Sequence, residues 1–345
     1  MPGRDTDRKR WMAAQGLSRR RLDAASRAVR LVMPPTPLVH SPSLSGHLGR
    51  PVWLKLETVT PIRAFKVRGA LARLAEIVAD GRVHRVVTAS SGNHGLAVAF
   101  AGRLAAVPVT VFVPANANPV KVAAIRDEGA EVVAGGRDYQ EAAERGAAFA
   151  AAAGADWVHP FDDPAVIAGQ ATVGREIAAA LPDVDRVVAP IGGGGLAAGI
   201  GVGLAHGAPS ARLVGAEMDG ADSMLRSIEA GRVVTLDSVR TVADGLAPRA
   251  VSERTRRLVE ALAEGIVRLP DEALFPAMRH LIERERVLVE PSGAAAVAAL
   301  LSGQVAGAGP VVAIVSGANV TAADLGRSLA APLPDLEGAA RGAGE

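Results

Sequence analysis

Short apolar runs rich in Val, Ile and Leu alternate along the chain with longer stretches rich in Ala. The apolar runs predict β-strands that are buried on both faces, because they are continuous and not alternating. The Ala-rich stretches between them predict helices. This strand–helix alternation is typical of parallel sheets covered by helices on both faces. The predicted strands are 52–57, 85–89, 109–113, 131–133, 186–191, 213–217 and 311–315.

Four helices are predicted with particular clarity, and each follows a strand. They span about 66–79, 93–106, 118–129 and 138–153. Since no long linker separates two halves of the chain, we expect a second domain to be inserted in the first rather than appended to it. The expected fold class is α/β, with two doubly wound open-sheet domains, the smaller inserted in the larger. The larger domain is expected at 1–84 and 163–345, with flexible ends at 1–16 and 331–345, and the smaller at 85–162.

Composition limits the class of protein. A chain of 345 residues with 49% hydrophobic content can bury a sizeable core. Because it has no cysteine, disulfides, thiolate metal sites and cysteine nucleophiles are excluded. No apolar run approaches the ~18 residues of a membrane span, and the polar N-terminus lacks the apolar core of a signal peptide. We therefore expect a soluble, cytoplasmic protein with no membrane partner.

The net charge of +2 hides a basic N-terminal segment: residues 1–30 hold nine Lys or Arg against three Asp. Such a segment can contact nucleic acid. Leu17, Leu22, Val29 and Val32, however, recur at helical spacing, which favours a helix docked on the body of the protein. With only 3% aromatic residues, we expect no nucleic-acid partner.

Lysine is rare: four lysines stand against thirty-four arginines. A lysine that was not replaced by arginine can be one whose amine must lose its proton, because a guanidinium stays protonated. Lys9 lies in the basic N-terminal run, which leaves Lys55, Lys66 and Lys121. Lys66 lies between a predicted strand and a predicted helix, a position that suits Schiff-base chemistry. The alternative is an ordinary surface lysine at the start of a helix.

Three junctions after predicted strands carry candidate binding groups. The run Gly192–Gly195 follows one strand and opens a helix, so its free N–H groups can converge on a phosphate; a flexible linker is the alternative. The run Thr88–Gly95 gathers hydroxyls, an amide and His94 at another helix start, which suits a small carboxylate. Helix capping by Ser90 or Ser91 and a structural role for His94 are the alternatives there. Ser316 ends the last predicted strand, which by itself is a weak signal.

Over residues 34–328 the chain resembles the fold-type II pyridoxal-phosphate enzymes, specifically the threonine/serine dehydratase and serine racemase group. The resemblance rests on several motifs that occur in the order usual for that group. These are Thr36-Pro-Leu, Phe65-Lys66, Ser91-Gly-Asn-His-Gly, His159-Pro-Phe-Asp-Asp-Pro-Ala-Val-Ile-Ala-Gly-Gln170, the four glycines, Val214-Gly-Ala-Glu217, Thr241-Val-Ala-Asp-Gly-Leu246, Glu290-Pro-Ser-Gly and Ser316-Gly-Ala-Asn319.

The resemblance implies a role for each matching residue. Lys66 would form an imine with pyridoxal 5'-phosphate and then act as the catalytic base, while Ser91 could return a proton to Cα. The implied cofactor-binding residues are Phe65, Lys66, Asn93, Gly192, Gly193, Gly194, Gly195 and Ser316. The substrate carboxylate would lie on Ser90, Ser91, Gly92 and His94. Glu217 and the carbonyl of Ala221 would match a cation site.

The expected activity is β-elimination of water from L-threonine or L-serine, which yields a 2-oxo acid and ammonia. A hydroxyl at Ser316, instead of a carboxylate, leaves the pyridine nitrogen largely neutral, and elimination then competes well. The alternatives are a serine racemase, a hydroxyaspartate ammonia-lyase, or a non-catalytic phosphate-binding regulatory protein. A small hydroxy amino acid would be the substrate, and the family expectation is a homodimer.

Two positions depart from the pattern of the family. Relatives usually carry a glycine where this chain has Arg63, which either points to solvent or reaches an acidic substrate side chain. Relatives with a divalent ion carry a second acid where this chain has Ser223. One carboxylate fewer weakens divalent binding, so a monovalent ion or none is also compatible with the sequence.

Overall fold

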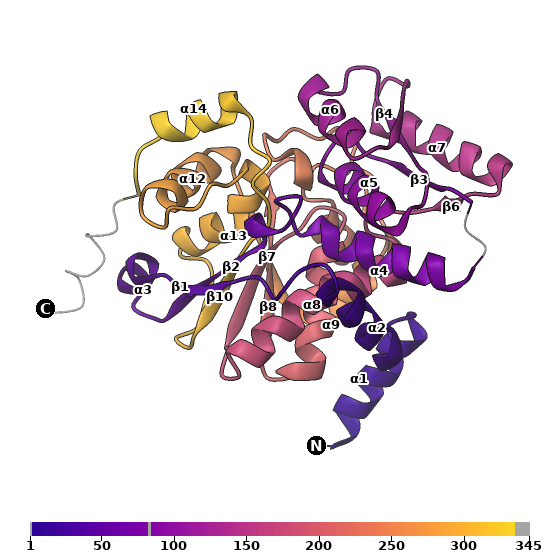
Figure 1. Cartoon of the computed structure of the whole chain (residues 1–345). Helices are drawn as coiled ribbons and strands as arrows, with labels where there is room; N and C mark the ends of the chain where they lie inside the picture. Colours follow the sequence, from indigo (N-terminus) through magenta and orange to yellow (C-terminus); the bar gives the residue numbers. More distant parts are fainter. Residues whose placement is uncertain (1, 82–83, 335–345) are drawn as a thin grey trace, which may run out of the picture. The chain divides into compact units, whose positions relative to one another are not determined.

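The structure, a computed structural model, describes residues 2–81 and 84–334 (Figure 1). Its contacts divide the chain into two compact units, each built from two separate stretches. Unit 1 comprises Met1–Pro34 and Phe65–Thr172, and unit 2 comprises Pro35–Ala64 and Val173–Glu345. One boundary therefore lies inside a single helix, α8 (Pro164–Ala180).

The described part of unit 1 holds a four-stranded parallel sheet with strand order β5-β4-β3-β6. From β3 the chain runs outward through β4 to β5 and then returns to the other side of β3. Such a sheet is doubly wound, and its switch point lies between β3 and β6. The elements are β3 (Val86–Ala89), α5 (Asn93–Ala105), β4 (Val109–Val113), α6 (Pro119–Asp127), β5 (Glu131–Ala134), α7 (Tyr139–Ala153) and β6 (Asp156–Trp157).

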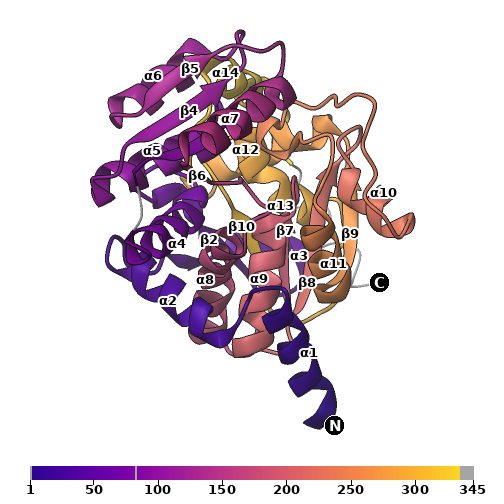
Figure 2. The ribbon, with the colours of Figure 1, turned by 90° about the vertical axis from the view of Figure 1, so that its right-hand side faces the viewer.

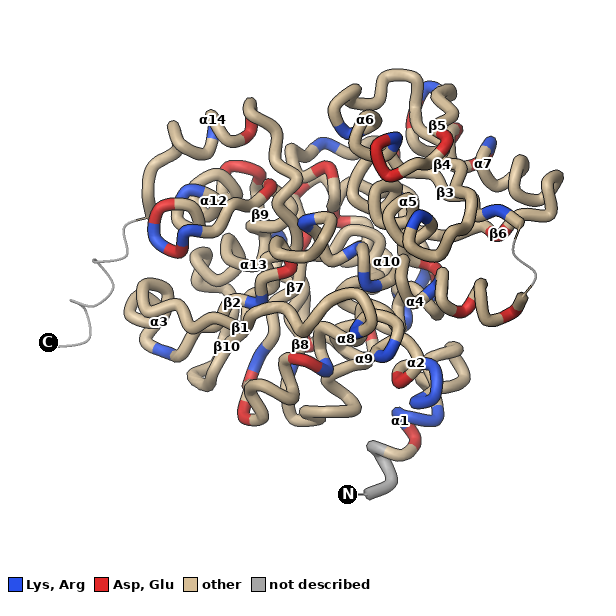
Figure 3. The backbone as a smooth tube through the Cα atoms, viewed as in Figure 1, with Lys and Arg blue, Asp and Glu red and all other residues tan. Residues whose placement is uncertain are grey.

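Three further helices belong to unit 1: α1 (Pro2–Ala14), α2 (Arg19–Arg30) and α4 (Lys66–Ala79). Helix α2 packs on α4 through a stripe that contains the buried Leu22 and Val29, which confirms the predicted docked helix. Arg21 on α2 forms an ion pair with Glu76 on α4 at 2.7 Å, and Figure 3 shows how basic this helix is. Helix α1 lies within the segment 1–16, whose flexibility stays a prediction, and Met12 in this helix is fully buried.

Unit 2 holds a sheet whose six described strands have the order β1-β2-β10-β7-β8-β9. The edge strand β1 is antiparallel to β2, and all other neighbours are parallel. The last strand in the sequence, β10, lies between β2 and β7, so the switch point of this sheet falls beside β7 and β10. The strands are β1 (Leu38–His40), β2 (Val52–Leu56), β7 (Arg186–Pro190), β8 (Arg212–Met218), β9 (Ala263–Leu269) and β10 (Val311–Val315).

The core of unit 2 forms where α13 covers its sheet. Alternate strand residues such as Val188 and Ala313 pack with the Ala294–Ala296 stretch of α13, and all of these side chains are fully buried. Small side chains on the helix allow this close approach. The remaining elements of unit 2, visible in Figures 1 and 2, are α3 (Pro42–Leu48), η1 (Glu57–Val59), α9 (Gly195–Gly207), α10 (Ser223–Glu229), η2 (Asp244–Leu246), α11 (Glu253–Leu262), η3 (Asp271–Ala273), α12 (Leu274–Glu283), α13 (Pro291–Leu301) and α14 (Ala322–Ala330).

The predicted α/β class and every predicted strand are confirmed, with ends that differ by one residue at most. The sequence missed β1, β6 and β9, since two of them are very short and the apolar run of β9 is interrupted by Glu264, Gly265 and Arg268. The strands of unit 1 all lie within the expected smaller domain at 85–162, but unit 1 also includes α1, α2 and α4. The boundaries of the functional domains, 1–84 with 163–345 against 85–162, stay a prediction.

Two further expectations concern the chain's ends and the membrane. Most of the expected flexible C-terminal end, residues 335–345, lies outside the described residues. No helix within the described stretches, 2–81 and 84–334, has the length and apolar character that crossing a bilayer requires.

Candidate active site

Lys66 begins α4, and its amine is poorly solvated. The Nζ atom donates a hydrogen bond to the carbonyl of Pro160 at 3.0 Å and lies 5.1 Å from the centre of the Phe65 ring. Among the described residues, no carboxylate pairs with it. Although part of the side chain remains exposed, burial of the amine lowers its pKa to about 8. Such an amine can lose its proton and act as a nucleophile or a base near neutral pH.

Lys55 provides a direct contrast. It is 1% exposed, and its Nζ lies 2.6 Å from the Glu176 carboxylate and 2.7 Å from the Thr36 carbonyl. A buried ammonium with a carboxylate partner stays charged and acts as a structural group. The structure thus separates two lysines that the sequence left together, and it supports Lys66 as the reactive one.

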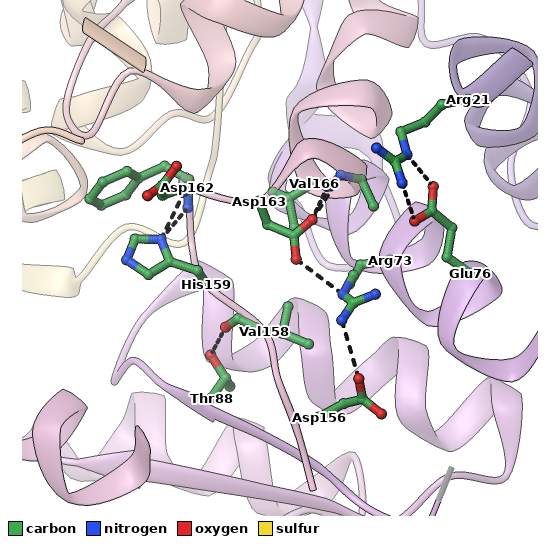
Figure 4. A network of polar contacts seen from close by, with 12 residues as sticks. Arg21, Arg73, Glu76, Thr88, Asp156, Val158, His159, Asp162, Asp163 and Val166 are labelled. Carbon is green, nitrogen blue, oxygen red and sulfur yellow. Dashed lines mark hydrogen bonds and ion pairs between the residues drawn. The ribbon is translucent and has the colours of Figure 1, made fainter. Parts of the chain in front are cut away.

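The carbonyl that receives Lys66 belongs to a braced loop after β6 (Figure 4). The Thr88 hydroxyl donates to the carbonyl of Val158 at 2.8 Å, and the N–H of Asp162 donates to His159 Nδ1 at 2.8 Å. Arg73 joins the two ends of this segment, 3.0 Å from Asp163 and 3.2 Å from Asp156. Because the loop leaves the carboxyl end of β6, Lys66 lies at the switch point of the unit 1 sheet.

The predicted carboxylate site follows β3 at the same switch point. The N–H of Gly92 donates to Ser90 Oγ at 3.1 Å, so Ser90 shapes the turn, and Gly92 itself is the N-cap of α5. Within the described residues the Ser91 hydroxyl makes no hydrogen bond, which leaves it available to a ligand. A Cβ on Gly95 would lie 2.3 Å from the Ser90 carbonyl, so only glycine lets α5 begin this close to the strand. Asn93 is the first residue of α5, directly after this turn.

His94 lies on the same turn and is 3% exposed. Its Nε2 lies 3.3 Å from the Val158 carbonyl, which can only accept, so Nε2 carries the hydrogen. Burial, and after it the charge of Lys66, holds the pKa of His94 well below its usual value. His94 is therefore a neutral ring anchored to the loop that leads to Pro160, which agrees with the structural alternative and leaves its predicted role at the carboxylate a proposal.

In unit 2, Gly192–Gly195 connect β7 to α9 in a turn that excludes side chains. A Cβ on Gly194 would lie 2.4 Å from Met224 Cε, and Gly194 also has a φ of +86°. A Cβ on Gly192 would lie 2.9 Å from the carbonyl of Gly245. Across the described chain, no N–H of this turn donates to an acceptor outside α9. These free N–H groups at the start of a long helix form a cradle for an anion such as a phosphate.

Ser316 follows β10, the strand next to β7, so it lies at the same switch point as the glycine turn. It is 4% exposed, and its hydroxyl makes no hydrogen bond to any residue that the structure describes. The turn after it is tied to the segment before Lys66: Gly317 pairs with Ala64, and the Ala318 N–H donates to the Arg63 carbonyl at 2.8 Å. A buried hydroxyl without a partner suits a ligand atom that needs a weak donor.

Glu217 and Ala221 are the residues predicted to bind a cation, and Glu217 is hydrogen-bonded to backbone N–H groups. The two oxygens of Glu217 accept hydrogen bonds from the N–H groups of Met224 at 2.9 Å and Leu225 at 2.8 Å. Burial raises the pKa of Glu217 to about 8, against the lowering effect of these two donors. Ala221 is fully buried nearby in the chain. Over residues 2–81 and 84–334, no group of three or more His, Asp or Glu side chains is arranged to hold a metal ion.

Arg63, the position where relatives carry glycine, adopts the left-handed backbone that glycine favours, with φ of +57°. Its exposed side chain lines a cavity of about 410 Å³ in unit 2. Arg286, also left-handed with φ of +59°, and Glu285 line the same cavity. Arg63 therefore belongs to a surface cavity of unit 2 by its contacts within that unit.

The site residues thus fall into two sets, one in each unit. Unit 1 supplies an amine of lowered pKa, and unit 2 supplies an N–H cradle and a buried hydroxyl. An amine of lowered pKa can form an imine with an aldehyde, and a cradle of N–H groups can bind a phosphate, so each set suits one part of a phosphorylated aldehyde. These residues fit pyridoxal phosphate.

Comparison with known proteins agrees. The family model described as pyridoxal-phosphate dependent enzyme matches residues 29–317, and the chain belongs to this family. It is 41% identical over 286 residues to the L-threonine ammonia-lyase of Geobacter sulfurreducens, a match that covers 83% of this chain and 71% of that protein.

Two solved structures extend the likeness to the fold. The processed form of threonine deaminase isoform 2 from Solanum lycopersicum superposes with a TM-score of 0.84 at 32% identity, covering 90% of this chain and 87% of that one. Maize serine racemase gives a TM-score of 0.84 at 31% identity, covering 90% of this chain and 96% of that one. The predicted fold-type II architecture is confirmed.

Proposed function

We propose that this chain is a pyridoxal-phosphate-dependent ammonia-lyase that removes water from L-threonine or L-serine. The observation that carries the proposal is the desolvated Lys66 amine in a chain that resembles an L-threonine ammonia-lyase over most of its length. Ser316 supports it, because an uncharged hydroxyl at the end of β10 leaves a pyridine nitrogen unprotonated.

Chain connectivity limits how far the backbone of Lys66 can lie from Ala64. Ala64 pairs with Gly317 inside unit 2, and Lys66 is only two residues further along the chain. Since consecutive Cα atoms are about 3.8 Å apart, the Cα of Lys66 lies within roughly 8 Å of the Cα of Ala64.

In this mechanism each group has one task. Bound pyridoxal phosphate supplies the sink that accepts the electron pair of the Cα–H bond. Lys66 Nζ takes the proton of Cα, and the carbonyl of Pro160 orients the amine through its remaining N–H. The turn Ser90–His94 holds the substrate carboxylate on the first N–H groups of α5. The hydroxyl leaves Cβ as water with the proton that Lys66 took from Cα, and a second water then replaces the amino group, which gives a 2-oxo acid and ammonia.

A second candidate is racemisation of serine or elimination from hydroxyaspartate on the same scaffold. The Ser91 hydroxyl favours the first, because within the described residues it has no partner and can deliver a proton to Cα. The likeness to maize serine racemase points the same way. Arg63 favours the second, since an exposed guanidinium two residues before Phe65 can attract a second carboxylate.

One experiment separates these functions. Purified protein is examined for the visible absorption of a lysine imine, and release of 2-oxo acid is measured from L-threonine, L-serine and hydroxyaspartate, with the chirality of recovered serine checked. We expect the visible band and the highest kcat/KM for L-threonine or L-serine. Absence of the band after incubation with pyridoxal phosphate would instead indicate the non-catalytic phosphate-binding regulatory protein. Inversion of serine that outpaces 2-oxo acid release would indicate a racemase.

The finer predictions on partners stay open. We propose a homodimer and a cytoplasmic location, which the resemblance implies. The resemblance also implies a monovalent or divalent cation at Glu217 and Ala221, but the two N–H groups that bind the Glu217 oxygens argue against it.

A further inference from the structure

Glu217 is the only carboxylate of β8, and it is fully buried at 0% exposure. It points its two oxygens at the start of α10, where the N–H groups of Met224 and Leu225 donate to Oε1 and Oε2 respectively. A buried carboxyl group that accepts one N–H on each oxygen is a directional anchor for the backbone that donates, because either N–H would be left unsatisfied without it. Glu217 therefore fixes the entry of the chain into α10.

Neighbouring acids do not complete a divalent site around Glu217. Asp222 is 1% exposed, but it is bound by Arg226 at 2.9 Å and by Arg268 at 3.1 Å. Ser223, at the position where relatives with a divalent ion carry an acid, is fully buried, and its Oγ lies 3.5 Å from the Pro248 carbonyl. A divalent ion takes several charged oxygens, and here one carboxylate is shared with two N–H groups.

What Glu217 anchors is in contact with the glycine turn. The methyl group of Met224 packs against Gly194 so closely that a Cβ on Gly194 would lie only 2.4 Å from it. Thr255 is the N3 residue of the capping box of α11 and packs against the same glycine from this second helix. Its Cβ would lie 3.0 Å from a Cβ on Gly194. Figure 2 shows α10 and α11 together beside β8 and β9. Gly194 is thus held between the first turns of two helices.

We propose that Glu217 is a positioning residue for the phosphate cradle. By holding the start of α10 it keeps Met224 against Gly194, and the N–H groups of Gly192–Gly195 stay converged. Backbone N–H donors perform this task here, in place of the cation that the resemblance suggested. The inference rests on the proposed function, in which the turn binds the cofactor phosphate.

The test compares two ligands that differ only in the phosphate: pyridoxal phosphate and pyridoxal, titrated into the apoenzyme. Glu217→Gln keeps the shape of the side chain but turns an amide donor toward one of the two N–H groups. We expect it to weaken pyridoxal phosphate binding about tenfold, as for loss of one buried hydrogen bond, and to change pyridoxal binding less than about twofold. Met224→Ala, which leaves Glu217 in place, should give a smaller loss with the same selectivity.

The matched control is Glu285→Gln. Glu285 is a second, largely buried carboxylate of unit 2, and its Oε1 accepts hydrogen bonds from the hydroxyls of Ser41 and Ser43 at 2.6 Å each. This substitution should lower thermal stability and leave the ratio of the two affinities unchanged. Equal losses for both ligands in Glu217→Gln and Met224→Ala, or no loss in either variant, would overturn the positioning role.

A separate titration tests whether a cation binds at Glu217. The wild-type apoenzyme is titrated with Mg²⁺, Ca²⁺ and K⁺ at constant ionic strength, and both the unfolding temperature and the affinity for pyridoxal phosphate are followed. We expect neither to change, nor to respond to a chelator. A saturable increase with any of these ions would overturn the replacement of the cation by N–H donors. Failure of the proposed function can be told apart from failure of the positioning role, because the wild-type protein would then not bind pyridoxal phosphate at all.

Discussion

Both units place candidate binding groups at the switch point of a parallel sheet, but the groups differ in kind. In each, candidate binding groups lie where two parallel strands end beside a switch point. Unit 1 presents side chains there, with the Lys66 amine, the Ser91 hydroxyl and the His94 ring. Unit 2 presents mainly backbone, the N–H groups of Gly192–Gly195, together with the buried Ser316 hydroxyl.

We infer from this difference that unit 1 provides the reacting groups and that unit 2 binds the cofactor. A side chain can change protonation and move, so it needs bracing, which unit 1 provides through Pro160 and the Arg73 ion pairs. A backbone N–H keeps its charge distribution and is positioned by the fold, so unit 2 depends on the absence of Cβ atoms at the turn and on the side chains packed against it. We infer that substitutions in unit 1 affect mainly turnover, while those in unit 2 affect mainly cofactor affinity.

The sharpest test of the unit 1 half is Lys66→Ala. Because the amine is the proposed base and imine partner, kcat for 2-oxo acid release should fall by about 10³-fold or more. The fold should persist, since Lys66 is at a helix start and only part-buried. Circular dichroism and a 2-oxo acid assay check this, with Lys121→Ala as the control lysine. Turnover near the wild-type rate would remove Lys66 from the reaction.

The unit 2 half is tested by Gly194→Ala. The new methyl group meets Met224 and Thr255, and the left-handed backbone adds strain, so the unfolding free energy should fall by about 2–4 kcal/mol. Affinity for pyridoxal phosphate should drop with it. Gly231→Ala is the matched control, since it has a φ of +65° but no neighbour within 4 Å, and it isolates the strain. Equal effects of the two substitutions on cofactor affinity would contradict the cradle.

The lowered pKa of Lys66 gives a pH test on the wild-type protein. Only the neutral amine attacks an aldehyde, so the rate of imine formation should rise with pH, about tenfold per unit, and level off above the pKa of about 8. An exposed lysine would keep rising until about 10.4. Stopped-flow absorbance of apoenzyme mixed with pyridoxal phosphate measures this, with N-acetyl-lysine as the reference amine. A profile that rises past pH 9 would show an ordinary, solvated lysine.

The smallest expected effect is that of Arg63→Gly. Glycine relieves the left-handed strain but adds freedom to the unfolded chain, so the net gain in unfolding free energy should be about 0.5 kcal/mol. If Arg63 selects an acidic substrate, the ratio of L-threonine to hydroxyaspartate turnover should also rise. Arg286→Gly relieves the same strain in the same cavity, at a position where relatives were not expected to differ, and should leave the ratio unchanged. An unaltered ratio in both variants would exclude Arg63 from specificity.

Sequence periodicity located most of the fold, and it failed where strands are short or where charged residues interrupt the apolar run. The two-residue β6 carries too little pattern to detect, yet its loop supplies the Pro160 carbonyl that holds Lys66. The motif that begins at His159 was visible in the sequence, but nothing in it indicated a backbone acceptor. Met224 and Thr255 were missed as supports of Gly194, because contacts across 30 or more residues leave no local signal.

The sequence by itself determined the α/β class, the strands and the order of the motifs, because continuous apolar runs and helix starts are local properties of the chain. It also singled out Lys66 and the four glycines by residue type. Only the tertiary structure decided which lysine is paired and which is left with a carbonyl, since Lys55 and Lys66 differ in their distant neighbours, Glu176 and Pro160. It likewise decided that the oxygens of Glu217 meet N–H groups, because desolvation and hydrogen bonding depend on what folding brings together.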